Sequence, residues 1–327
     1  MAAKSEKKIL GMERETFRQF MGKYGISVIM VIMIIAIAIY RPVFLSGTNI
    51  VNIITQISIN GMLAFGMCLA ITTGGIDLTV GAQLAVVGVI MGQMITNNGL
   101  PIAVGILIGV AVSTLFGFIN GFLIARFNMF PFVVTLSMQL IIRGAAQVIS
   151  GGKAITFGAG VKNLYYGKLF GVIPYPIVAL FVVFVIMYIM FHWTKLGRYI
   201  LAVGGNANAA VASGVSEFRI KVICYTISGF LAGIAAVIMA AKTGSGQSNL
   251  GVGYETDAVA ASVIGGTSFA GGIATMPGVL MGIFIVGFIY NGINLIGINA
   301  NWQSIIRGAI IIGTVMLDMA INGRNRK

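Results

Sequence analysis

Charged side chains are scarce in this sequence. Asp, Glu, Lys and Arg make up 9% of its 327 residues, whereas 58% are hydrophobic. A soluble domain carries about 25% charged residues, so a soluble fold is excluded. Unbroken apolar runs such as IVALFVVFVIMYIMF (177–191) also exclude a transmembrane β-barrel, whose segments of about ten residues alternate apolar and polar side chains. The composition predicts an all-α polytopic membrane protein, with a single transmembrane domain over residues 1–327.

Carboxylates, cysteines and catalytic motifs are also few. The chain has 8 Asp and Glu residues, and none falls at the middle of a clearly predicted span. A carrier driven by protons or sodium usually places a carboxylate there, so we expect another source of energy. Cys68 and Cys224 lie in apolar runs without Cys or His ligand spacing, which argues against a disulfide framework or a metal site. No HExxH, GxSxG or P-loop pattern occurs, so we expect no catalytic residue on this chain.

Apolar runs bounded by glycine, proline or charged residues follow one another along the chain. A bilayer core of about 30 Å needs roughly 20 apolar residues per helix, and the run lengths predict about 10 transmembrane helices. The predicted spans are 25–40, 57–71, 80–95, 101–125, 131–149, 170–191, 222–241, 258–270, 277–296 and 305–320. The run 258–270 is short, which is typical of a half-helix or a re-entrant segment.

Lys and Arg residues are unevenly distributed between the predicted loops. If the amino terminus is cytoplasmic, most of them fall in the tails 1–24 and 321–327 and in cytoplasmic loops such as 192–221. The positive-inside rule then predicts that both termini are cytoplasmic. The net charge of +13 therefore indicates topology rather than nucleic-acid binding. A cleaved signal peptide is the alternative for the first apolar run, but Arg41-Pro42 follows it at once, so we expect a retained span.

The pentapeptide IIRGA occurs twice, at 141–145 and 305–309, each time shortly after a span that carries an Asn-Gly pair. The two copies are separated by an odd number of predicted spans. An odd offset inverts the second copy relative to the first, as in the inverted repeats of transporters. The alternative is chance similarity, which is common between apolar segments.

The longest predicted cytoplasmic loop between spans, residues 192–221, has a distinctive composition. It contains a stretch rich in alanine and other small residues at 206–215, preceded by Gly204-Gly205. This pattern predicts a short helix between flexible joints. A short exposed helix with little bulk can bind in a groove on a partner protein. The alternative is a helix that lies on the membrane surface without a partner.

Amide side chains within the predicted spans are candidates for a polar pathway, because they can replace the water around a polar solute. Each can instead form a hydrogen bond with a neighbouring helix, which is the commoner role of an intramembrane amide. Arg143 and Arg307 are expected to be structural charges near helix ends or opposite Asp77 and Asp318. The amide candidates are Gln56, Asn60, Asn120, Gln139, Asn291 and Asn294.

Four stretches together resemble one known family. They are TTGGIDLTVGA (72–82), GRYILAVGGNANAAVASGV (197–215), GYETDAVAASVIGGTSFAGG (253–272) and NGINLIGINANWQSIIRGAIIIGTVMLD (291–318). In this order they are similar to the permease subunit of ribose-type monosaccharide ABC importers, and the resemblance covers nearly the whole chain from Phe44 onward. It implies the ABC importer permease fold and a location in the bacterial cell (inner) membrane.

The resemblance also implies partners. In that family two permease chains form the pathway, so a homodimer is expected. A cytoplasmic ATPase with two cassettes binds ATP and Mg²⁺, and an extracytoplasmic sugar-binding protein delivers the monosaccharide. No cofactor is expected on this chain and no nucleic acid. The competing readings are a secondary carrier or channel that works without an ATPase, and an intramembrane enzyme.

The segment NAAVASG (208–214) resembles the EAA-three-residues-G signature by which importer permeases contact their ATPases. Asn208 stands where that signature has Glu. The resemblance therefore assigns an ATPase-coupling role to this loop. Its implied coupling residues are Gly204, Gly205, Asn206, Asn208, Ala209, Ala210, Ser213 and Gly214.

Three carboxylates outside the middle of the spans complete the candidate sites. Asp77 is expected at the cytoplasmic side of the junction between the second and third spans, where it reaches water or a basic partner and caps the next helix, with Thr79 as the alternative cap. The resemblance implies a helix break or gate there. Glu255 and Asp257 fall in the predicted outer segment 244–257, where they receive the binding protein, guard the entrance or belong to a solvated loop.

Overall fold

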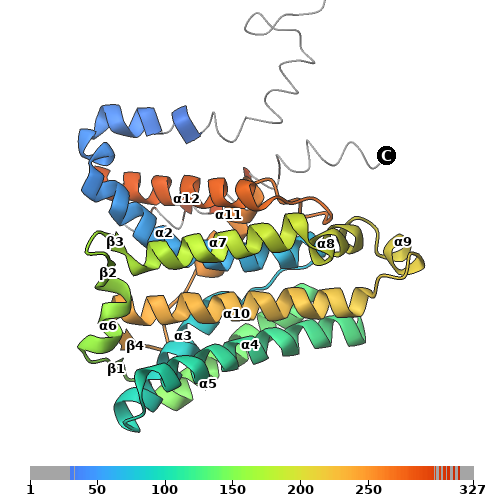
Figure 1. Ribbon diagram of the computed structural model, residues 1–327, viewed down its shortest axis with the longest axis horizontal. Helices are drawn as coiled ribbons and strands as arrows, with labels where there is room; N and C mark the ends of the chain where they lie inside the picture. Colours follow the sequence, from blue (N-terminus) through green and yellow to red (C-terminus); the bar gives the residue numbers. More distant parts are fainter. Residues whose placement is uncertain are drawn as a thin grey trace, which may run out of the picture.

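The computed structural model describes residues 30–32 and 34–297, together with 299, 302, 305, 306, 308, 309, 312, 313 and 316. Within these residues the chain forms a bundle of helices that run roughly side by side (Figure 1). The short helices α8 (Lys195–Gly205) and α9 (Ala207–Ala212) lie at one end. The helix α6 (Ala159–Tyr166) lies at the opposite end. We call these the α9 end and the α6 end.

Seven helices of the described part are long and apolar enough to cross a membrane, judged by length and composition. They are α2 (Gly47–Thr72), α3 (Thr79–Gly92) with its π-helical continuation η2 (Gln93–Asn97), α4 (Ile102–Phe127), α5 (Pro131–Ser150), α7 (Tyr175–Trp193), α10 (Glu217–Thr243) and α12 (Met276–Ile296). The prediction of a polytopic helical membrane protein is confirmed, whereas the number of ten spans is not.

Several predicted features lie partly or wholly outside the described residues. The first predicted span is represented by the short helical stretch Met30–Tyr40, followed by the 3-10 helix η1 (Pro42–Leu45). Most of the span 305–320 falls outside the described residues, as do both predicted tails, Arg307 and Asp318. The second IIRGA copy (305–309) is described except for Arg307, but no contact or pairing in the described residues relates it to the first copy, so the inverted repeat stays a prediction.

The ends of the spanning helices follow local sequence signals. Ser46 caps α2 by accepting a hydrogen bond from the backbone N–H of Asn49, and Ser216 caps α10 through the N–H of Arg219. Such caps satisfy N–H groups that a helix leaves unpaired in its first turn. At the other end of α10, Gly244 takes the left-handed conformation with φ +65°, which only glycine adopts at little cost. Polar caps and glycines thus mark these boundaries.

The centre of the bundle is formed by α2, α3 and α10. In the most apolar part of α2, 83% of the residues are buried, compared with 22% in α4 and in α5. The large exposed side chains of α4, α5 and α7 are mainly aliphatic or aromatic, as expected for surfaces in contact with lipid. Between α4 and α10 the backbones approach closely at Gly117 and Gly229, where an added Cβ would collide with the facing helix. Small residues allow this close packing of membrane helices.

The predicted short span 258–270 has an unusual structure. The helix α11 (Tyr254–Ile264) has 11 residues, too few to cross a bilayer. It is preceded by residues 244–253, which contain the two-residue strand β4 (Ser245–Gly246) and continue as turns; for brevity we call this non-helical stretch the extended segment. This segment leaves the end of α10 and follows α3, with Gly246 against Gly88 and Gly251 against Gly81. Non-helical backbone at membrane depth is tolerated where protein surrounds it. The chain therefore crosses the bundle as an extended segment followed by a half-helix.

At the α6 end, short strands tie the surface to the interior. The strand β1 (Ile155–Thr156) pairs antiparallel with β4 (Ser245–Gly246), which opens the extended segment. A separate hairpin joins β2 (Lys168–Leu169) to β3 (Ile173–Pro174). The hydroxyl of Thr96 donates to the carbonyl of Thr156, so η2 also holds β1. The surface layer at this end is thus bonded to the segment that enters the bundle.

Candidate functional site

The predicted helix in the loop 192–221 is present at the α9 end. Helix α9 is six residues long, and its N-cap Asn206 accepts a hydrogen bond from the N–H of Ala209 at 3.0 Å. It ends at Ser213 and is followed by Gly214 with φ +84°. The predicted coupling residues divide by exposure: Gly205, Asn206, Asn208, Ala209, Ser213 and Gly214 are exposed, Gly204 is half-buried and Ala210 is buried. The helix therefore presents small, exposed side chains and backbone.

Gly204 connects α8 to the interior of the bundle. A Cβ at this position would overlap the carbonyl oxygen of Thr72 at the end of α2 and would crowd the backbone of Gly272. The N–H of Gly272 itself donates to the carbonyl of Thr72 at 2.9 Å. Three backbones from α8, α2 and the loop before α12 thus meet at one point, which gives α8 a direct contact with the end of α2 and with the loop that leads into α12.

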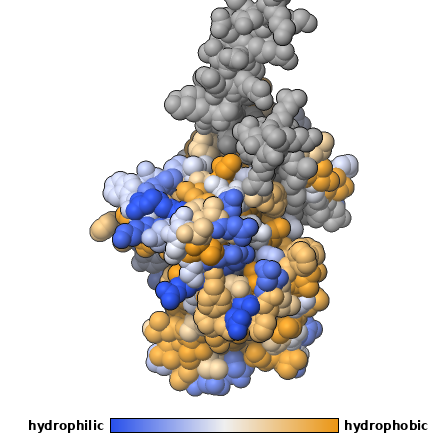
Figure 2. Space-filling model, turned by 90° about the vertical axis from the view of Figure 1, so that its right-hand side faces the viewer, coloured by the Kyte–Doolittle hydropathy of each residue, from blue (hydrophilic) through white to orange (hydrophobic). Residues whose placement is uncertain are grey.

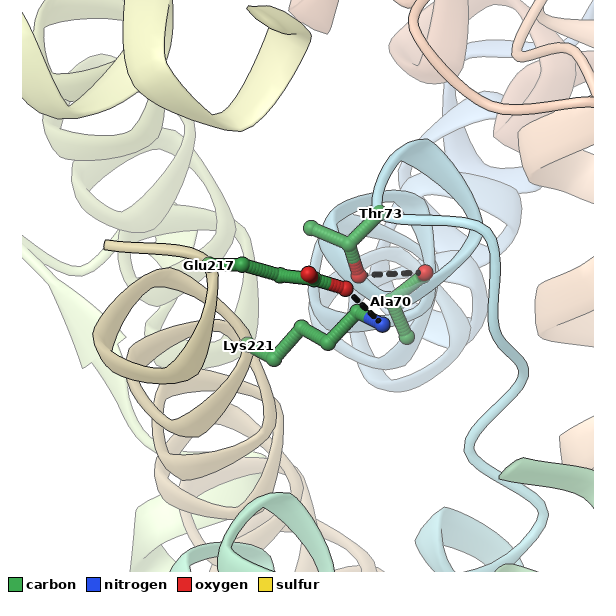
Figure 3. A network of polar contacts seen from close by, with 4 residues as sticks. All are labelled: Ala70, Thr73, Glu217 and Lys221. Atoms are coloured by element: carbon green, nitrogen blue, oxygen red, sulfur yellow. Dashed lines mark hydrogen bonds and ion pairs between the residues drawn. The ribbon is translucent and has the colours of Figure 1, made fainter. Parts of the chain in front are cut away.

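Beside this contact, the α9 end carries a cavity of about 470 Å³ between α8 and the start of α10. Figure 2 faces this end and shows hydrophilic residues gathered over part of it, with apolar residues around them. Glu217 and Lys221, on the first turns of α10, form an ion pair of 2.6 Å. Figure 3 shows this pair next to the end of α2, where the Thr73 hydroxyl donates to the carbonyl of Ala70. Ala70 of α2 packs in one cluster with Tyr225 of α10, so the two helices are neighbours at this end. The cavity is lined by Leu196, Tyr199, Gly214, Val215, Ser216, Arg219, Ile220 and Ile223.

Asp77 does not reach water, contrary to the prediction. Its side chain is fully buried because residues 73–78 fold back against α5 and α10, where the hydroxyl of Tyr225 donates to the carbonyl of Ile76. The carboxylate accepts hydrogen bonds from the N–H of Thr79 at 3.1 Å and from the hydroxyls of Thr79 and Ser228. The predicted contact with the start of α3 is therefore present, although Leu78 occupies the N-cap position.

Asp77 belongs to a buried polar network that links three helices. The Thr79 hydroxyl donates to Asp77 and accepts from the amides of Gln83 at 2.8 Å and Asn120 at 3.1 Å. Gln83 in turn accepts from the Ser113 hydroxyl at 2.6 Å. Among the described residues no Lys or Arg forms an ion pair with Asp77. Buried polar groups of this kind are stabilised by mutual hydrogen bonding rather than by a counter-charge.

The predicted pathway amides are not brought together. Gln56 and Asn294 are exposed, while Asn120 is fully buried and bonded to Thr79. Asn291 pairs with Asn49 of α2 at 3.0 Å. Asn60 is half-buried, and its carbonyl oxygen has no hydrogen-bond partner. Asn120 and Asn291 therefore bond to neighbouring helices, the alternative recognised from the sequence.

The structure separates the roles of the two carboxylates in α11. Asp257 is 3% exposed and accepts from the hydroxyl of Tyr290 at 2.6 Å, so the predicted contact with a binding protein is wrong for this residue in the described conformation. Its environment is the packing of α11 against α12. Glu255 is half-buried and accepts from Gln139 of α5 at 3.2 Å and from the N–H of Gly253. It faces α5 rather than an outer surface.

Arg143 is a functional candidate that the sequence left among the structural charges. It does not face Asp77 but contacts the extended segment, donating to the carbonyl of Leu250 at 3.1 Å and to that of Ser248 at 3.5 Å. The spacing of Gln139, Arg143 and Gln147 along α5 was a usable signal, because residues four apart lie on one helix face. Within the described ranges, no three His, Cys, Asp or Glu side chains gather as ligands for a metal.

Comparison with known proteins places this geometry in a family. Residues 49–315 match the family model described as the permease component of the branched-chain amino acid transport system. The chain belongs to this permease family. The permease is 38% identical over 320 residues to the ribose import permease protein of Bacillus subtilis (strain 168), with 96% of this chain and 98% of the relative covered.

Two further relatives are named for other sugars. The galactose/methyl galactoside import permease protein of Escherichia coli (strain K12) is 35% identical over 329 residues, covering 94% of this chain and 97% of the relative. The D-allose transport system permease protein of the same organism is 35% identical over 309 residues, covering 94% of each chain. No solved structure matches the permease. The resemblance carried by the four sequence stretches is confirmed, and the family is that of a transport component rather than a catalytic subunit.

Proposed function

We propose that this permease is the membrane subunit of an ATP-driven importer of a monosaccharide. The observation that carries the proposal is its similarity, over nearly its whole length, to transport permeases named for ribose, galactose or allose. The description of the family model names branched-chain amino acids instead. We favour a sugar because the relatives share 35% or more of their residues with this chain.

The proposed assembly has two copies of the permease in the bacterial cell (inner) membrane. Its ATPase, which binds ATP and Mg²⁺, contacts the α9 end from the cytoplasm, and a sugar-binding protein delivers substrate at the α6 end. The exposed surface of α9 supports this assignment, as does the concentration of Lys and Arg expected on the cytoplasmic side. Both termini are then cytoplasmic.

The proposed mechanism uses the contact at Gly204. Closure of the ATPase cassettes moves α8 and α9, and the backbone contact with Thr72 and Gly272 passes that displacement to α2 and to the loop before α12. A partner shifts a conformational equilibrium only through contacts that differ between the two states. Packing this tight has little freedom to absorb a shift of α8, which suits it to such transmission.

The test is transport by the reconstituted complex. The permease, its ATPase and its binding protein are placed in proteoliposomes, and uptake of D-ribose, D-galactose, D-allose and L-leucine is measured with and without ATP. We expect ATP-dependent uptake of at least one sugar and none of leucine. An ATPase variant that binds but does not hydrolyse ATP is the control. Sugar uptake without the ATPase would establish a carrier or channel instead, and leucine as the transported solute would refute the monosaccharide assignment.

A further inference from the structure

A polar face of α5 contacts the extended segment inside the bundle. Gln139, Arg143 and Gln147 follow one another at intervals of four residues, so they lie on the same side of the helix. Each reaches the same stretch of chain: Gln139 donates to Glu255, Arg143 to the carbonyls of Ser248 and Leu250, and Gln147 accepts from the Ser248 hydroxyl at 3.2 Å. The three residues thus define one contact between α5 and residues 248–255.

Two atoms in this contact are left without a partner. The Nη2 atom of Arg143 and the Oε2 atom of Glu255 are both buried, and neither makes a hydrogen bond. The two side chains carry opposite charges, yet within the described residues they do not form an ion pair. Arginine and carboxylate groups usually meet through two parallel hydrogen bonds. Arg143 bonds through Nη1 and Glu255 through Oε1, which leaves one buried donor and one buried acceptor without a partner.

The backbone around Glu255 determines where its carboxylate lies. The Oε2 atom lies so close to Gly81 in the first turn of α3 that an added Cβ would overlap it, and Gly251 packs against the same turn. Gly253, just before α11, takes φ +85° and directs its N–H to the Oε1 atom of Glu255. Glycine at these positions therefore allows the carboxylate to sit between α3, α5 and α11. Such local adaptation of the chain is typical of a positioned functional group.

We infer that Arg143, Glu255 and Gln139 form a binding site for neighbouring hydroxyl groups of the transported solute, a site that rests on the proposed monosaccharide function. A hydroxyl both accepts and donates hydrogen bonds. One hydroxyl accepts from Nη2 of Arg143, and its neighbour donates to Oε2 of Glu255. The amide of Gln139 holds the carboxylate in orientation. Both unpartnered atoms are then satisfied, which removes the penalty of burying them unpaired.

The charge balance of the site favours a neutral polyol over an anion. The charges of Arg143 and Glu255 cancel, so a phosphate or a carboxylate would be attracted by Arg143 and repelled by Glu255. A zwitterionic amino acid would also match the pair, with its carboxylate at Arg143 and its ammonium group at Glu255. The sugars in the names of the relatives favour the polyol. Wild-type uptake of sugars and of leucine distinguishes the two kinds of ligand.

The experiment measures maximal uptake by the complete complex in proteoliposomes, with the binding protein saturated by each solute. The best transported of D-ribose and D-galactose is compared with its monodeoxy analogues, 2-deoxy-D-ribose, or 2-deoxy-D-galactose and D-fucose. The variants are Glu255→Gln, Gln139→Ala and Arg143→Gln. The matched control is Gln147→Ala, which removes a contact with Ser248 on the same helix face but reaches neither unpartnered atom.

A hydrogen bond from a hydroxyl to a charged group typically corresponds to a factor of about 10 or more. We expect Glu255→Gln to reduce uptake of the parent sugar by about that factor, and to leave uptake unchanged, relative to the wild type, for the analogue that lacks the contacted hydroxyl. Arg143→Gln should show the same pattern with a neighbouring hydroxyl. Gln147→Ala should stay within about twofold of the wild type for every sugar, since it breaks no contact with solute.

The inference is overturned if each variant loses the same factor for the parent sugar and for every analogue, because that pattern belongs to residues that only position the extended segment. Unchanged uptake in Glu255→Gln and Gln139→Ala overturns it as well. Copurification of the ATPase confirms assembly, and if Arg143→Gln fails to assemble, the other two variants decide. A wild type that transports leucine and no sugar refutes the proposed function itself, whereas wild-type sugar uptake with insensitive variants refutes this site alone.

Discussion

The contact between α8 and α2 at Gly204 gives a sharp prediction, because the next residue provides its control. In Gly204→Ala the new methyl group would overlap the carbonyl of Thr72 and crowd the backbone of Gly272, neither of which is the movable end of a side chain. At Gly205 a Cβ would meet nothing within 4 Å. The two substitutions are chemically identical and adjacent. They differ in whether α8 can stay against α2.

The expected magnitude follows from overpacking. Forcing an extra methyl into a closely packed contact costs about 1–3 kcal/mol, whereas replacing glycine by alanine within a helix is favourable by up to about 1 kcal/mol. Gly204→Ala should therefore displace α8 and reduce ATP-driven uptake by about tenfold, since about 1.4 kcal/mol corresponds to a factor of ten. Gly205→Ala should transport like the wild type, with equal or slightly higher thermal stability.

The assay combines uptake with ATP hydrolysis in proteoliposomes. If Gly204 transmits motion, Gly204→Ala uncouples the two: the ATPase still copurifies and hydrolyses ATP, while sugar uptake falls. Thermal unfolding of the purified permease shows whether the loss arises from global instability. Wild-type uptake in Gly204→Ala would refute the reasoning, and so would an equal loss in Gly205→Ala.

Three further predictions concern other contacts. Asp77→Asn should reduce transport more than membrane insertion, because an amide cannot accept from Thr79 and Ser228 as a carboxylate does; uptake and the membrane-inserted amount are measured together, and wild-type uptake would make Asp77 a replaceable structural group. Tyr290→Phe should lower the free energy of unfolding by about 1–3 kcal/mol, since it removes the donor to buried Asp257; thermal unfolding checks this, with Tyr199→Phe as an exposed control, and an unchanged midpoint would contradict it. Deletion of residues 206–214 should abolish copurification of the ATPase, and retained copurification with full transport would show that α9 is not the docking helix.

Much of the architecture could be predicted from local patterns. Asn206 and Gly214 bracket a stretch of small residues, and a short capped helix lies between them. The run 258–270 was too short to span, and α11 is correspondingly a half-helix. These features depend on neighbours in the chain, so composition and spacing are sufficient to find them. Family membership was equally accessible, because four motifs occur in a fixed order.

The positions of the buried charges were not accessible in the same way. Asp77 was placed near water because a break between two spans usually lies at the membrane surface, but residues 73–78 turn inward against Tyr225 and Thr135. Asp257 and Glu255 were placed in an outer loop because the extended segment has no periodicity that reveals its path along α3. Each case depends on contacts between residues far apart in sequence, which a linear pattern does not contain.

The pairing of β1 with β4 has a mechanical consequence, because it joins the surface at the α6 end to the part of the chain that enters the bundle. Ile155 and Thr156 are bonded directly to Gly246 and Ser245, and nine residues after Gly246 the chain reaches Glu255. The first part of this connection is closely packed, because Gly246 lies directly against the backbone of Gly88. A displacement of the surface residues near α6 would therefore be transmitted to the interior of the bundle through this short connection, without passing through any of the long helices.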